Sequence, residues 1–124
     1  MNYHETLTQM LSAAATAARG QWNALRGYAH EEFERVAEAG AWIEADYLAD
    51  IAEAQQQGDA SRRCALEAKA KARAELALDT LKLAAERVLV AAVADAKLAA
   101  QDAVNAAIGV LRSAINRSIG VPIF

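Results

Sequence analysis

The chain has 124 residues, of which 55% are hydrophobic, and a formal net charge of −3 at pH 7. This length suits one modest domain, and the weakly acidic balance argues against nucleic acid as a partner and against a polybasic membrane arm. A single cysteine, Cys64, excludes an intrachain disulfide framework.

The N-terminal residues, MNYHETLTQML, lack the basic segment that begins a secretory signal peptide. The longest uncharged apolar run in the second half of the chain, Val88 to Ala94, is much shorter than the ~20 residues that a membrane span requires. We therefore expect the protein in the cytoplasm or inside an assembled particle, without a signal peptide or transmembrane helix.

Residues 5–56 carry apolar side chains at steps of three or four, which is the pattern of one helical face. The only proline, Pro122, lies near the C-terminus. Gly20, Gly27 and Gly40 each cost ~1 kcal/mol relative to alanine and can bend a helix without ending it. The pattern therefore predicts one continuous helix.

The residues around Gly58, QQQGDAS, form the one cluster of helix-breaking residues between these apolar stretches. Asp59 or Ser61 can cap a following helix, because its side-chain oxygen accepts a hydrogen bond from a free backbone N–H. We expect a turn at residues 58–60.

Residues 60–118 repeat the three-and-four spacing, and Gly120 followed by Pro122 signals the end of the second helix. The sequence predicts an all-α fold, a long antiparallel two-helix hairpin with helices at about 5–56 and 60–118. Its single domain, 1–124, divides into helix 1 (1–57), the turn (58–60), helix 2 (61–118) and an apolar C-terminal tail (119–124).

The charged residues beside the turn favour this antiparallel pairing. Most of those in 31–59 are acidic, and most of those in 62–73 are basic. Folding at Gly58 is expected to pair Asp46 with Lys71 and Glu44 with Arg73. Because an exposed pair contributes only ~0–1 kcal/mol, such pairing selects the register more than it adds stability.

The second predicted helix is apolar over more of its circumference than one partner helix can cover. We therefore expect hairpins to pack into a helical bundle by homo-oligomerisation through their apolar base. The expected interface residues are Val93, Val104, Ile108, Leu111, Ile115 and Ile119. The C-terminal tail is expected to dock through Val121, Ile123 and Phe124.

Residues 30–50, HEEFERVAEAGAWIEADYLAD, place one histidine and several carboxylates along the first predicted helix. Di-metal sites in four-helix bundles use a histidine three residues after a glutamate, but Gly27 occupies that position before His30. His30 and Glu34 flank the apolar stripe, whereas Phe33 lies on it. We expect a solvated acidic face here, with no metal site and no cofactor.

The sequence favours a non-enzymatic role. Glu44 and Asp50 lie six residues apart without a sign of a pocket, and Cys64 has no histidine near it in sequence. No phosphate-binding loop or nucleophile motif is present. The aromatic residues Trp22, Phe33, Trp42 and Tyr47 are expected to pack between the alanine-lined helices.

The chain is thus expected to be a structural or adaptor protein that assembles with itself through the apolar base. It would join other proteins in a larger assembly of virion or secretion type, and it would not bind nucleic acid. One alternative is a ferritin-like carboxylate metal-binding bundle made by two hairpins. Another is an amphipathic lipid-surface or granule coat, which is disfavoured because the apolar face lacks bulky side chains and alanine, its main residue, inserts poorly into lipid.

Overall fold

The computed structural model describes all 124 residues and confirms the all-α class, with helices and no strand. The elements in chain order are α1 (Tyr3–Ala18), η1 (Arg19–Gln21), α2 (Trp22–Gln55), α3 (Ala60–Ala92), η2 (Ala94–Ala96) and α4 (Lys97–Ile119). The two η elements are single 3₁₀ turns.

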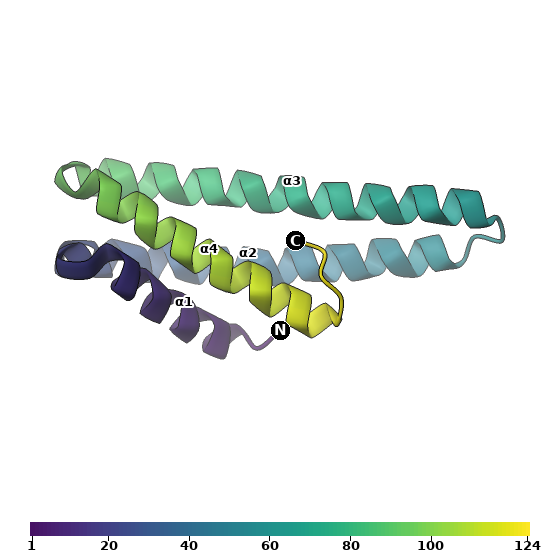
Figure 1. The fold of residues 1–124 in the computed structure, drawn as a ribbon, viewed down its shortest axis with the longest axis horizontal. Coiled ribbons are helices and arrows are strands. Elements are labelled where there is room, and N and C mark those ends of the chain that lie inside the picture. Colours follow the sequence, from purple (N-terminus) through teal and green to yellow (C-terminus); the bar gives the residue numbers. More distant parts are fainter.

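The helices form two layers (Figure 1). The long helices α2 and α3 make an antiparallel hairpin, connected by residues 56–59. At the opposite end from this connection, the chain folds back through η1 and η2, so that the shorter helices α1 and α4 lie side by side against the hairpin. The end of the hairpin nearest the connection extends beyond α1 and α4 (Figure 1), and we call it the tip.

Each of the two long helices expected from the sequence is interrupted once, which corrects that expectation. The first is broken at η1 and the second at Val93–Ala96. Val93 leaves the helical region, with φ −133° and ψ 58°. Since two straight helices would leave the apolar row through Val104 and Ile108 uncovered, folding back is the conformation that buries more apolar surface.

The expected oligomer-interface row lies inside the folded chain. Val104, Leu111 and Ile115 are completely buried, and Ile108 is nearly so. They belong to one core cluster with residues from α1, α2 and α3, among them Met10, Leu25, Phe33, Leu78 and Leu89. Burying a side chain of this size contributes ~1.5–3 kcal/mol to the free energy of unfolding. Here the row makes that contribution within a single chain.

The crossing of α4 over α2 depends on Gly40. A Cβ at this position would lie 2.6 Å from Cδ1 and 2.9 Å from Cδ2 of Leu111, which is completely buried. The missing side chain lets α4 approach α2 closely, and Leu111 fills the space. This glycine therefore has a packing role in the middle of a long helix.

Gly40→Ala should destabilise the protein by about 1–2 kcal/mol, because Leu111 must move within a close-packed core and the overpacking outweighs the gain in helix propensity. Chemical denaturation monitored by circular dichroism measures the change. Gly27→Ala is the matched control on the same helix. Its Cβ would meet nothing within 4 Å, so it should stabilise by up to ~1 kcal/mol. Equal effects of the two substitutions would contradict the Gly40–Leu111 crossing.

Arg19 holds a strained backbone where α1 ends, with φ 52° and ψ −130°. Residues other than glycine occupy this region at a cost of ~1–3 kcal/mol. Arg19→Gly should therefore raise the free energy of unfolding by about 1 kcal/mol. Arg26→Gly, within exposed α2 helix, should lower it by about as much. A destabilising Arg19→Gly would contradict the positive φ of Arg19.

Candidate functional site

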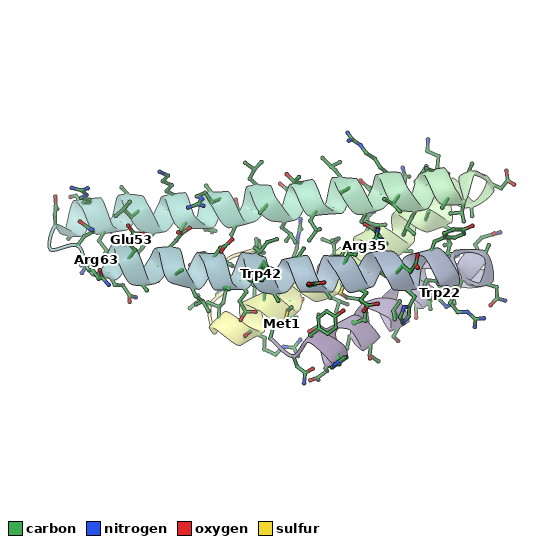
Figure 2. The ribbon with its side chains drawn as sticks, turned by 180° about the vertical axis from the view of Figure 1, so that it is seen from behind. Met1, Trp22, Arg35, Trp42, Glu53 and Arg63 are labelled. Carbon is green, nitrogen blue, oxygen red and sulfur yellow. The ribbon has the colours of Figure 1, made fainter.

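One face of the α2–α3 pair is not covered by the second layer. α4 meets the other face, where Leu111 packs at Gly40 and Arg112 lies 3.5 Å from Asp79. Figure 2 is drawn from the uncovered side, with α1 and α4 behind α2 and α3. We call this surface the open face.

A groove runs along the open face between α2 and α3. Its main part has a volume of about 480 Å³ and is lined by Ile43, Asp46, Tyr47, Asp50, Ala70, Arg73, Ala74, Leu76, Ala77 and Thr80. A smaller hollow of about 150 Å³ continues it toward the tip and adds Glu53, Leu66 and Lys69. The groove is wide because α3 presents alanines to α2 here, and small side chains leave space between helices.

Large apolar side chains lie exposed on these same helices. Trp42 is 64% exposed and Leu76 is 68% exposed, and Leu83, Tyr28 and Val88 are exposed as well. Trp42 was expected between the helices, but its side chain points to solvent. Ile43, the next residue, lies ~100° further around α2 and faces α3. Leu76 and Leu83 were not singled out from the sequence. Their spacing of seven residues places them on one helical face, away from the apolar row through Ala74 and Leu81. This spacing was the sequence signal for an exposed apolar pair.

Two rows of exposed residues with opposite charge border the groove. Each row advances by three, four or seven residues, so its members share a helical face. The α2 row consists of Tyr28, Glu31, Arg35, Trp42, Asp46 and Glu53, and the α3 row of Arg62, Lys69, Arg73, Leu76, Thr80, Leu83 and Arg87. The α3 row contains no acid. In the α2 row the one base, Arg35, lies 3.5 Å from Glu32 on its own helix.

The structure pairs the charges of the hairpin differently from the sequence expectation. Arg73 binds Asp50, at 3.0 Å, instead of Glu44. Asp46 and Lys71 are both exposed and form no ion pair. The difference follows from the connection, because α3 begins beyond the end of α2 (Figure 1). This offset moves every α3 residue toward the tip relative to a symmetric turn at Gly58.

Glu44 instead anchors the end of α4 on α2. It is 7% exposed, accepts a hydrogen bond from Ser118 Oγ at 2.5 Å, and lies 3.5 Å from the amino group of Met1. Nearby, the Tyr3 hydroxyl donates to the backbone oxygen of Glu34 at 3.4 Å. Desolvation, followed by the Glu34 charge, raises the pKa of Tyr3 above its ordinary value. These contacts hold the second layer to the middle of α2.

Ser118→Ala should lower the free energy of unfolding by about 1–2 kcal/mol, because the buried Glu44 carboxylate loses a charge-assisted hydrogen bond. Thermal or chemical denaturation measures it. Ser113→Ala, an exposed position on the same helix with no side-chain hydrogen bond, should change stability by less than about 0.5 kcal/mol. Indistinguishable variants would contradict the role assigned to Ser118.

The C-terminal tail turns back against its own helix. α4 ends at Gly120, which adopts the left-handed conformation with φ 89°. Asn116 Oδ1 then accepts hydrogen bonds from the backbone N–H of Ile123, at 2.9 Å, and of Phe124, at 3.2 Å. Ile123 is buried in the core cluster and Phe124 is half-buried beside Leu78 and Arg112, whereas Val121 is exposed. Of the other expected interface residues, Val93 and Ile119 are half-buried.

Residues considered for metal or thiol chemistry lie apart from one another. No group of three or more His, Cys, Asp or Glu side chains is arranged to hold a metal ion. His30 is exposed on α2, and Cys64 is an exposed free thiol on the tip. None of the helices has the length and apolar character needed to cross a membrane.

No protein-family model, curated protein or solved structure matches this chain.

Proposed function

We propose that this chain is a non-enzymatic structural or adaptor protein that acts by binding protein, and that its first partner is another copy of itself. The observation that supports this is the open face, where Trp42, Leu76 and Leu83 project into solvent beside rows of opposite charge. Tryptophan is enriched at interfaces and at their energetic centres. A large exposed apolar patch on a soluble domain commonly marks a binding surface.

The assembling surface in this proposal differs from the apolar base expected from the sequence. Val104, Ile108, Leu111 and Ile115 pack inside the chain and are not free to bind a second one. The open face replaces them, because its apolar side chains have no partner within the fold. Membership of a larger assembly, of virion or secretion type, remains part of the proposal.

Light scattering during size-exclusion chromatography tests this function. The mass should be a multiple of the 13.2 kDa chain and should fall on dilution. When the same protein is mixed with vesicles of anionic phospholipid and the vesicles are floated, the protein should remain in the unbound fraction. A chain that is monomeric at about 1 mM would contradict self-assembly, and flotation with the vesicles would favour a lipid-surface coat instead.

A further inference from the structure

We infer that two copies pair through their open faces about a two-fold axis parallel to the helices, so that α2 of each copy covers α3 of the other. This inference rests on the proposed function and adds the surface, the symmetry and the register. The partner that covers the open face is a second copy of this chain. Charge complementarity and the area of the face support this choice.

The charge rows distinguish the two ways in which a two-fold axis can join these faces. An axis perpendicular to the helices would place α2 against α2, so that the acidic α2 rows of the two copies would meet. It would also place the basic α3 rows together. An axis parallel to the helices places the acidic α2 row over the basic α3 row at both positions. Like charges across an interface are penalised and opposite charges guide association, so the parallel axis is favoured.

A parallel axis also fixes the register, because rotation about it leaves the position along the helices unchanged. Each α2 residue then lies over the same α3 stretch that it already faces in its own chain. Glu53 and Lys69 line one hollow within the chain, so Glu53 of one copy lies near Lys69 of the other. By the same rule, Trp42 lies over the region of Thr80 and Leu83, which supplies its apolar contact.

The available area matches a stable pair. The α2 stretch from residue 28 to 55 is ~40 Å long at ~1.5 Å per residue, and two helices are ~20 Å wide, so the face measures roughly 800 Å². Standard stable interfaces bury ~800 Å² on each partner. The pairing would also cover the tip, whose two helices meet through small residues such as Ala54, Ala70 and Ala74.

Substitution of the apolar anchors tests the face. Leu76→Glu and Trp42→Glu should each weaken pairing at least 100-fold, as measured by sedimentation equilibrium, with unchanged helical circular dichroism because both side chains are exposed. Leu98→Glu is the matched control. Leu98 is 72% exposed on α4, outside the open face, and its substitution should leave the dimer intact.

Charge exchange tests the register. Glu53→Lys and Lys69→Glu should each weaken pairing about 10-fold, and the double variant should recover most of the loss because the opposite charges are restored in swapped positions. A double variant weaker than either single variant would contradict the α2-over-α3 arrangement.

The single native cysteine reports the symmetry without any substitution. With a parallel axis, spin labels on the two Cys64 thiols lie at the same end of the dimer, about 20–30 Å apart, because packed helices are ~10 Å from axis to axis. With a perpendicular axis they lie at opposite ends, more than about 40 Å apart along helices of this length.

The outcomes separate this inference from the function on which it rests. A monomeric wild-type chain overturns both. An oligomer that is unaffected by Leu76→Glu, that exceeds two copies, or that separates the Cys64 labels by more than about 40 Å overturns the inference alone.

Discussion

The close approach of α4 to α2 at Gly40 is the contact on which the rest of the structure depends. Leu111 occupies the space that a side chain at position 40 would fill, and this brings the row from Val104 to Ile115 into the core. The Glu44–Ser118 hydrogen bond then holds the end of α4 at the middle of α2. Once one face of the α2–α3 pair is covered in this way, the opposite face is left exposed, with Trp42, Leu76 and Leu83 in solvent.

The helical class and the break near Gly58 could be predicted from the sequence, because local signals suffice for both. Apolar spacing of three and four residues specifies a helical face, and Asp59 is the N-cap of α3, accepting a hydrogen bond from the Ser61 N–H at 3.0 Å. The folding back of α1 and α4 against the hairpin could not be predicted from such local signals. The break at Val93–Ala96 contains neither glycine nor proline, and at the other break the unusual φ falls on Arg19 and not on Gly20. Both breaks are set by packing between distant parts of the chain.

The same limit applies to the candidate binding surface. Sequence spacing identified the apolar row through Ile108 correctly as a row that needs covering, but it could not tell whether a second copy or α1 and α2 of the same chain would cover it. The tryptophan at position 42 shows the converse. Its neighbour Ile43 faces α3, so Trp42 is turned outward, and only the placement of α4 on the other side leaves it uncovered. The surface is therefore a consequence of the fold-back.

A distance between Ala45 and Arg117 tests the fold-back most directly. Both residues are exposed, and they adjoin Glu44 and Ser118, so cysteines introduced there in a Cys64→Ser background can carry spin labels. With unlabelled protein in excess to suppress distances between copies, the labels should lie within about 25 Å of each other. A straight hairpin would place Arg117 opposite the start of the chain, about 60 Å from residue 45 at ~1.5 Å per residue, and that distance would contradict the structure described.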